Sequence, residues 1–308
     1  MGGIGGWLAF GRGSGERCDG LLGNESLLKT VAAADADRPS TCAELGDAIK
    51  KATTGGEPGR HTVAQAQAMK SVLYALAPAE GHRVELDPTL RPLLASALAD
   101  YGPDVYARLH SLDPAYTTKA GADIPPWQDA QGVHMAVDYI HLLNVLAAVA
   151  EDPEAYAAVR MATARTAERD LASVPAGAAG DAAETPAVRG ARALGAMNGV
   201  AATVGKRLGD EKSRTWRTRV AEALLASSAD APAGDGGVAG HLTSTWLRDL
   251  RATAPEARAD FVEAQPVEMI RIWATERGAG EAASQRLRSS AENSSTAAAN
   301  EAQRALGK

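Results

Sequence analysis

Apolar side chains recur at helical spacing along most of the chain, and the clearest example lies in the segment 133–149. At 100° per residue, one stripe of this segment holds five large apolar side chains. They are Met135, Tyr139, Leu142, Leu146 and Val149. The opposite side is also mostly apolar, and a helix that is apolar on most of its circumference is buried inside a bundle. The pattern therefore predicts a central, buried helix over 133–149.

Two further helix starts carry capping boxes, in which a Thr accepts a backbone N–H and a Glu or Gln three residues later reaches back. Thr41 with Glu44 forms the first pair, and Thr62 with Gln65 forms the second. Apolar residues follow each pair at spacings of three and four. No alternating run of β-branched residues is long enough to indicate a strand. The sequence therefore predicts an all-α fold, a multi-helix bundle joined by Gly/Pro loops.

A change in composition divides the chain. Residues 173–186 contain Ala, Gly, Asp and Pro without periodicity, and predict a flexible connection between two helical subdomains. We expect an N-terminal helical domain over 16–172 and a C-terminal helical subdomain over 186–278. The segment 279–308 is mostly Ala, Ser, Glu, Asn and Gln, with few large apolar residues. Because such a segment buries little apolar surface, we expect a disordered C-terminal tail.

A helix expected over 190–208 carries small residues at every fourth position, at Ala191, Gly195 and Gly199. A glycine inside a helix costs about 1 kcal/mol relative to alanine, which suggests a packing reason for keeping it. We therefore expect a smooth helix face where the backbone of another helix approaches closely.

The charge of the chain narrows the classes of function. The chain has 308 residues and a net charge of −6, which argues against a general nucleic-acid surface. A local basic run surrounds Trp216. Its members are Lys206, Arg207, Lys212, Arg214, Arg217 and Arg219. Neighbouring acidic residues dilute this run, so a solvated helix face is favoured over contact with an acidic partner or nucleic acid.

Targeting and redox signals are sparse. The N-terminal residues have neither a basic n-region nor an apolar h-region of useful length, so we expect no Sec signal peptide. We also expect no membrane span, and a location that is cytoplasmic or reached by a non-Sec export route. Cys18 and Cys42 fit neither a metal knuckle nor a redox pair. A disulfide between them is possible if the protein is exported, and two buried or free thiols are the favoured interpretation.

Three polar residues interrupt the helix expected over 133–149: His134, Asp138 and His141. Spacings of four and three return to the same side of a helix, so these residues are expected to share one narrow face. Such a face could bind zinc or another divalent ion, or act as an acid–base pair. No second ligand-rich helix accompanies them. The nearest candidates in the sequence are Asp104, His110 and Asp113. A hydrogen-bonded polar seam between helices is therefore favoured over a metal site.

Several helix-packing phrases of the chain match those of a group of proteins. The phrases are Cys42–Thr54, His61–Leu76, Leu90–Leu94, Leu98–Tyr101, Asp104–Val105, Val149–Tyr156 and Gly190–Leu208. Together they span most of residues 40–225. In these phrases the chain resembles uncharacterised, Ala-rich, mostly helical actinobacterial proteins, often encoded with WXG-type small helical proteins, type VII secretion components or polymorphic-toxin genes. The resemblance implies a link to a secretion or toxin system and supplies no catalytic residues.

The patterns leave three hypotheses about function. The first is a non-enzymatic helical interaction or scaffold protein that binds a protein partner, or a second copy of itself, at an apolar helix face. The helical pattern, the smooth faces and the lack of a catalytic motif favour it. The second is a metal-dependent enzyme that uses His134, Asp138 and His141. The third is a toxin or effector body. No cofactor is expected, because the Gly-rich segments lack the preceding strand that a dinucleotide site needs.

Overall fold

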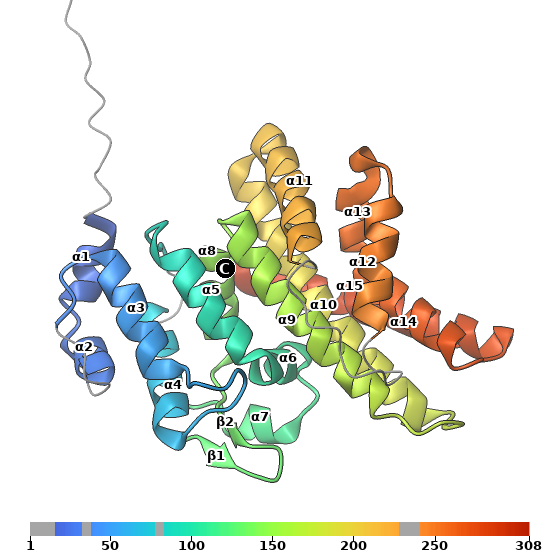
Figure 1. Cartoon of the computed structure of the whole chain (residues 1–308), viewed down its shortest axis with the longest axis horizontal. Helices are drawn as coiled ribbons and strands as arrows, with labels where there is room; N and C mark the ends of the chain where they lie inside the picture. Colours follow the sequence, from blue (N-terminus) through green and yellow to red (C-terminus); the bar gives the residue numbers. More distant parts are fainter. Residues whose placement is uncertain (1–15, 33–37, 78–82, 228–240, 308) are drawn as a thin grey trace, which may run out of the picture.

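The computed structural model describes residues 16–32, 38–77, 83–227 and 241–307. Helices make up most of this part of the chain, and its only strands form one short antiparallel pair (Figure 1). The all-α fold class expected from the sequence is confirmed. The N-terminal residues on which the signal-peptide expectation depends lie outside the described ranges.

The elements follow one another in chain order. The first seven helices are α1 (Glu16–Leu22), α2 (Glu25–Ala32), α3 (Cys42–Thr53), α4 (Val63–Leu76), α5 (Leu90–Asp100), α6 (Gly102–His110) and α7 (Pro114–Thr118). The strands β1 (Trp127–Gln128) and β2 (Val133–His134) come next, followed by α8 (Tyr139–Val149), α9 (Pro153–Ala172), α10 (Asp181–Leu208) and α11 (Asp210–Ala226). The last elements are α12 (Leu242–Ala252), a 3-10 turn (Pro255–Ala257), α13 (Arg258–Glu263), α14 (Gln265–Glu276) and α15 (Glu281–Leu306).

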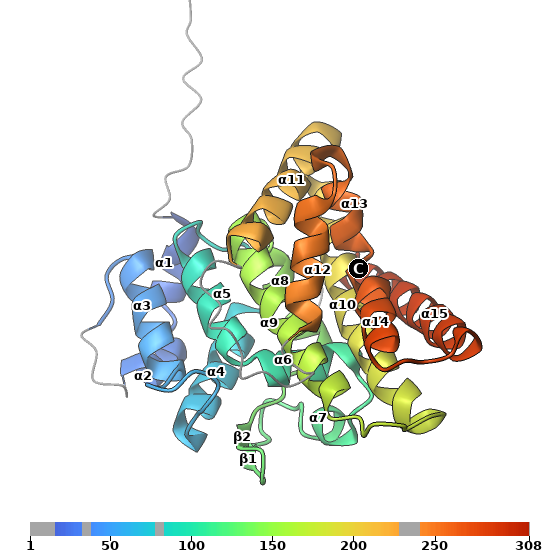
Figure 2. The same ribbon diagram turned by 45° about the vertical axis from the view of Figure 1, so that its right-hand side comes forward.

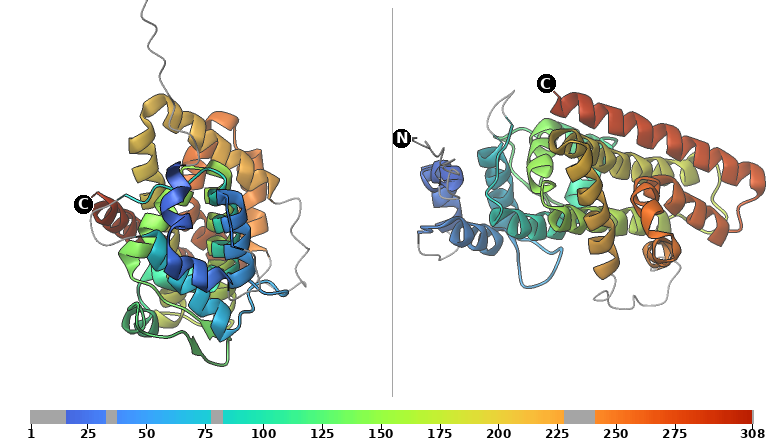
Figure 3. Two further views of the ribbon diagram at one scale, coloured as in Figure 1. Left: turned by 90° about the vertical axis from the view of Figure 1, so that its left-hand side faces the viewer. Right: turned by 90° about the horizontal axis from the view of Figure 1, so that it is seen from above.

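The long helices α9 and α10 pack on each other in the middle of the molecule (Figure 1). On one side α5 packs on α9, and α3 and α4 continue outward from α5 (Figure 2). On the other side lie α11, α12, α13 and α14, while α15 runs beside α10 (Figure 3). One cluster of buried apolar side chains reaches from Cys18 to Ala302. The proposed division into two subdomains stays a prediction, although residues 181–186 of the expected connection are the first turns of α10.

Both capping boxes are confirmed. The Thr41 side chain accepts from the backbone N–H of Glu44, and the Glu44 carboxylate accepts from the N–H of Thr41. Thr62 and Gln65 make the same exchange at the start of α4. These contacts satisfy N–H groups that the first helical turn would otherwise leave without partners, and they fix the starts of α3 and α4.

The helix expected over 133–149 begins only at Tyr139, so the first part of that prediction is wrong. Residues 133–134 form β2, in which His134 lies opposite Trp127 of β1. The carbonyl of Val137, which a continuous helix would use internally, accepts instead from Nε of Arg108 at 2.7 Å. A buried side chain from α6 therefore competes with the helical hydrogen bond and keeps this segment extended.

The disordered tail expected over 279–308 is also corrected, because residues 281–306 form the helix α15 along α10. A Cβ on Gly195 would overlap the backbone of Ser295, and a Cβ on Gly199 would lie 2.7 Å from Cβ of Ala302. The smooth face expected on α10 is thus confirmed, and α15 occupies it. Close approach of two small-residue faces supplies dispersion contacts along the helices without large apolar side chains.

Cys18 of α1 and Cys42 of α3 form a disulfide, with their Cα atoms 5.7 Å apart, so the favoured interpretation of two unpaired thiols is wrong. The bond closes a loop that includes α2 and ties the first helices of the chain together. Among the helices that the structure describes, none has the length and apolar character that a membrane span requires.

Candidate functional site

The three residues expected to share one helix face are separated by the structure. His134 lies on β2, Asp138 precedes the first turn of α8, and His141 lies within that turn. Asp138 and His141 remain neighbours, with 3.9 Å between Oδ2 and Nδ1. The single helix face on which the metal hypothesis depends is therefore absent.

His134 lies between two carboxylates. Its Nδ1 is 3.2 Å from Oδ1 of Asp104 and 2.9 Å from the hydroxyl of Tyr116. Its Nε2 is 2.9 Å from Oδ1 of Asp129. The Tyr116 hydroxyl also donates to Asp104, whose carboxyl is buried. These contacts join the β1–β2 hairpin to α6 and α7, and they occupy both ring nitrogens of the histidine.

The electrostatics of this cluster follow from burial and hydrogen bonding. The hydrogen bond with Asp104 raises the pKa of His134, with a smaller contribution from Asp129, while burial opposes the shift. Burial raises the pKa of Asp104, and its contacts with His134 and Tyr116 oppose that rise. Both shifts favour the protonated form of the group concerned, and both ring nitrogens of His134 have hydrogen-bond partners within the cluster.

Asp138 belongs to a second polar cluster, whose other side chains come from α4. The Tyr74 hydroxyl lies 3.0 Å from Oδ2 of Asp138 and accepts from its backbone N–H at 3.2 Å. One turn earlier, the buried Lys70 donates from Nζ to the carbonyl oxygens of Lys119 at 3.1 Å and Ile124 at 2.6 Å. Lys70 and Tyr74 therefore fasten the segment 119–138 to α4. Of the three residues expected to form one polar seam, only Asp138 takes part in this cluster; His134 lies in the separate cluster with Asp104 and Asp129, and Nδ1 of His141 has no hydrogen-bond partner within the described residues.

No group of three or more His, Cys, Asp or Glu side chains that could hold a metal ion occurs in the described ranges. The other residues named as nearest candidates are used differently. His110 accepts from the backbone N–H of Leu112 at 3.0 Å, and Asp113 caps α7.

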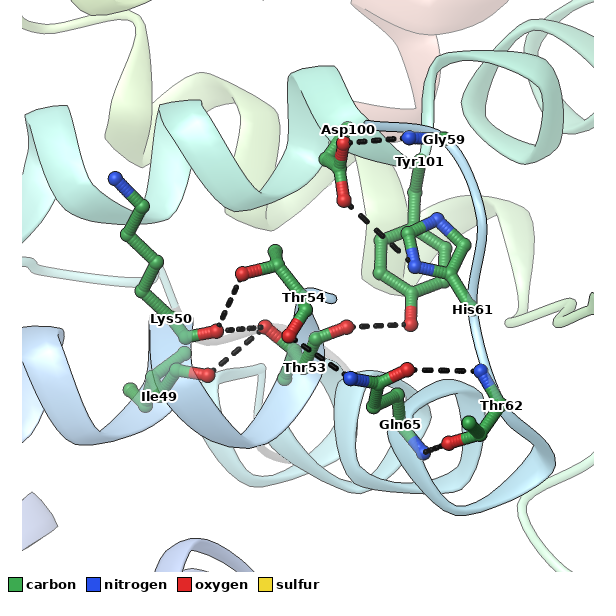
Figure 4. A network of polar contacts seen from close by, with 10 residues as sticks. All are labelled: Ile49, Lys50, Thr53, Thr54, Gly59, His61, Thr62, Gln65, Asp100 and Tyr101. Carbon is green, nitrogen blue, oxygen red and sulfur yellow. Dashed lines mark hydrogen bonds and ion pairs between the residues drawn. The ribbon is translucent and has the colours of Figure 1, made fainter. Parts of the chain in front are cut away.

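A further histidine, not identified from the sequence, lies beside a cleft. The His61 ring stacks on the ring of Tyr101, with centroids 3.7 Å apart, and its Nδ1 is 3.7 Å from Oδ2 of Asp100 (Figure 4). Neither ring nitrogen has a hydrogen-bond partner within the described residues. Asp100 also accepts from the N–H of Gly59 at 2.7 Å, and both residues line a cleft of about 760 Å³ between α5 and α9. The side chain of His61 is itself buried, at 3% exposure.

The most unusual charged group is Arg160 of α9, whose side chain is almost fully buried at 1% exposure. Its guanidinium is held by four neutral acceptors at 2.7–2.8 Å. They are the Gln265 side chain, the Tyr156 hydroxyl, the Asn198 side chain and the Val262 carbonyl. Within the described residues no carboxylate lies within ion-pair distance of it.

Arg160 lines a pocket of about 290 Å³ bounded by α9, α10, α11 and α13. Two residues of the predicted basic run, Lys206 and Arg217, line the same pocket. Arg217 pairs with Asp260 at 2.7 Å and with Glu263 at 3.1 Å. The basic run was therefore a useful signal for the wall of this pocket. The sequence pattern does not identify Arg160, because its hydrogen-bond acceptors lie up to 105 residues away in sequence.

No protein-family model matches this chain, and neither a curated protein nor a solved structure shows significant similarity to it.

Proposed function

We propose that this chain is a helical interaction or scaffold protein that acts by binding a protein partner and not by catalysis. The observation that carries the proposal is the arrangement at His134. Both ring nitrogens are engaged within the protein, by Asp104 and Tyr116 on one side and by Asp129 on the other. A general base needs a ring nitrogen within hydrogen-bond reach of the substrate proton, and both nitrogens of this imidazole already have partners within the protein.

The polar cluster at Asp138 supports the same proposal. Lys70 and Tyr74 use their polar atoms on the backbone and side chains of the segment 119–138. Buried polar groups that satisfy one another in this way position the chain and specify one conformation. The metal-dependent alternative has no supporting arrangement in the described residues, and we do not propose it.

We further propose that the partner comes from a secretion or toxin system. This step rests on the resemblance of residues 40–225 to proteins often encoded with WXG-type small helical proteins. The Cys18–Cys42 disulfide supports a working location outside the reducing cytosol, because disulfides persist in oxidising compartments. Export from the cytosol is therefore part of the proposal. The hypothesis of a toxin or effector body stays a prediction, which expression without growth inhibition would argue against.

Sedimentation velocity of the purified chain, alone and mixed with a WXG-type small helical protein, tests the proposal. We expect either a concentration-dependent dimer or a complex that can be reconstituted from the two purified components. A chain that stays monomeric in both samples at concentrations of about 100 μM contradicts the proposal, because that limit corresponds to binding weaker than about −5.5 kcal/mol.

Two exposed apolar residues give matched variants for locating the contact. Val63 at the start of α4 is 47% exposed and Leu112 between α6 and α7 is 48% exposed. Val63→Ser and Leu112→Ser therefore remove similar apolar surface at different places. A partner that contacts only one place loses affinity with only one of the two variants.

A further inference from the structure

The pocket at Arg160 has a feature that the proposed interaction function does not use. A buried charge is costly unless an opposite charge or a complete set of hydrogen bonds compensates for it. Arginine has five N–H donors, and the four hydrogen bonds of Arg160 leave one N–H on Nη2 without an acceptor. The positive charge is solvated by neutral groups but not neutralised within the described residues.

The charges around the pocket favour a negative occupant. The cationic side chains that line it are Arg160, Lys206 and Arg217, against the acidic Asp210 and Glu263. Glu263 is already paired with Arg217. Lys206 is exposed, and its Nζ lies 3.4 Å from the neutral side chain of Gln303. Arg217 also pairs with Asp260, which lies outside the lining. Among the lining residues themselves, three cationic side chains face two carboxylates, and Arg160 has no carboxylate within ion-pair distance among the described residues.

The rest of the lining suits an apolar or aromatic body. The rings of Tyr156 and Trp216 lie 5.1 Å apart at an interplanar angle of 50°. Val220 and Val262 add aliphatic surface to the same pocket. The indole N–H of Trp216 donates to the carbonyl of Ala150. A ligand in the pocket can therefore pack against the indole ring but cannot accept a hydrogen bond from its N–H. Small-molecule sites combine such apolar walls with a few convergent polar groups, and about 300 Å³ is the lower end of their usual volume.

We propose that this pocket binds a small organic carboxylate with an aromatic or branched apolar body. The carboxylate is attracted by Arg160 and Lys206, and the body lies against Trp216 and Val220. This site is separate from His134 and its carboxylates, and it adds small-ligand binding to a protein whose proposed function is to bind another protein.

The test uses benzoate as the probe and benzamide as its uncharged counterpart of nearly the same shape. Isothermal titration of the full chain is expected to show saturable benzoate binding with a Kd below about 1 mM, and benzamide binding at least about tenfold weaker. Benzoate is also expected to raise the Tm, because a ligand that binds only the folded chain stabilises it. Inorganic phosphate serves as a third probe and is expected to bind more weakly than benzoate, since it lacks the apolar body.

Four variants assign the binding to this pocket. Lys206→Met is expected to weaken benzoate binding by about fivefold. Arg160→Gln is expected to weaken it by more than about tenfold. Ala202→Phe places a ring in the lining and is expected to abolish binding without removing a charge. Arg214→Gln removes an exposed charge from α11 outside the lining and is expected to leave benzoate affinity unchanged. If Arg160→Gln fails to fold, Lys206→Met and Ala202→Phe still decide the question.

Three outcomes of the benzoate, benzamide and variant measurements overturn the proposal. They are an absence of saturable benzoate binding, equal affinity for benzoate and benzamide, and benzoate affinity that Ala202→Phe and Lys206→Met leave unchanged. Equal or tighter binding of phosphate also overturns it, because the pocket would then select an anion without an apolar body. None of these results bears on whether the chain dimerises or binds a helical protein partner, so the two proposals fail separately.

Discussion

Gly195 of α10 lies directly against the backbone of Ser295 of α15, so that no side chain larger than a hydrogen atom fits between the two helices there. The contact brings together residues 100 positions apart in the sequence. It packs α15 against α10 at the centre of the molecule. It explains why a segment with few large apolar side chains is nevertheless ordered.

Gly195→Ala is expected to destabilise the protein by about 1–3 kcal/mol, because the added methyl group must push α15 away from α10. Urea denaturation measures the loss. Gly20→Ala is the control, since Gly20 is an exposed helical position with no atoms within 4 Å of the added Cβ. That control is expected to leave stability unchanged or slightly higher. A Gly195→Ala chain as stable as the wild type would contradict the packing of α15.

The Cys18–Cys42 disulfide is expected to contribute about 3 kcal/mol, mainly by restricting the unfolded chain between two residues separated by 24 positions. The intact mass of the native protein should rise by two hydrogens on reduction, and the urea midpoint should fall. The double variant Cys18→Ser, Cys42→Ser should show neither response to reductant. Two thiols that react with an alkylating agent before any reduction would contradict the pairing.

His110 should make the protein sensitive to acid. Burial lowers the pKa of His110 to about 4, with the charge of Arg189 acting in the same direction. Below about pH 6.5 the unfolded chain takes up a proton that the folded chain refuses, so stability falls as the pH drops from about 6.5 towards 4. The loss from this group is at most about 3 kcal/mol.

His110→Asn keeps an acceptor for the N–H of Leu112 and removes the titrating ring. Urea denaturation at several pH values between about 4 and 6.5 is expected to give a shallower pH dependence for this variant than for the wild type. Identical slopes for the two proteins would show that His110 does not titrate in the buried position described here.

The capping signals in the sequence predict local structure correctly, whereas features that depend on distant residues are not predicted. The pairs Thr41–Glu44 and Thr62–Gln65 predict their helix starts because each capping contact spans three residues. The spacing of Gly195 and Gly199 predicts a close approach, but not that α15 makes it.

The errors at the candidate site have the same origin. Apolar periodicity over 133–149 is compatible with one helix. What keeps its first residues extended is the contact between Arg108 and Val137, which joins positions 29 apart in sequence. The surroundings of Arg160 could not be predicted from the sequence either, because Val262 and Gln265 lie more than 100 residues after Arg160 in the chain.

The pH response of the His134 cluster has the opposite sign to that of His110. Hydrogen bonding to Asp104 raises the pKa of His134 above its ordinary value of about 6.5. The stabilisation is therefore fully present below about pH 6.5, and it is lost as the pH rises through the raised value. Burial raises the pKa of Asp104, which acts in the same direction.

His134 and its hydrogen-bond partners join the β1–β2 hairpin to α6 and α7, and we expect these contacts to stabilise the fold without a bound metal ion. Thermal unfolding of the wild type and of His134→Asn, each at about pH 5.5 and about pH 8.5 with and without EDTA, tests this most directly. We expect His134→Asn to lower the Tm, with the larger loss at the lower pH, and EDTA to leave the wild-type Tm unchanged. A wild-type Tm that falls on chelation, together with a His134→Asn protein that no longer responds to EDTA, would contradict the claim.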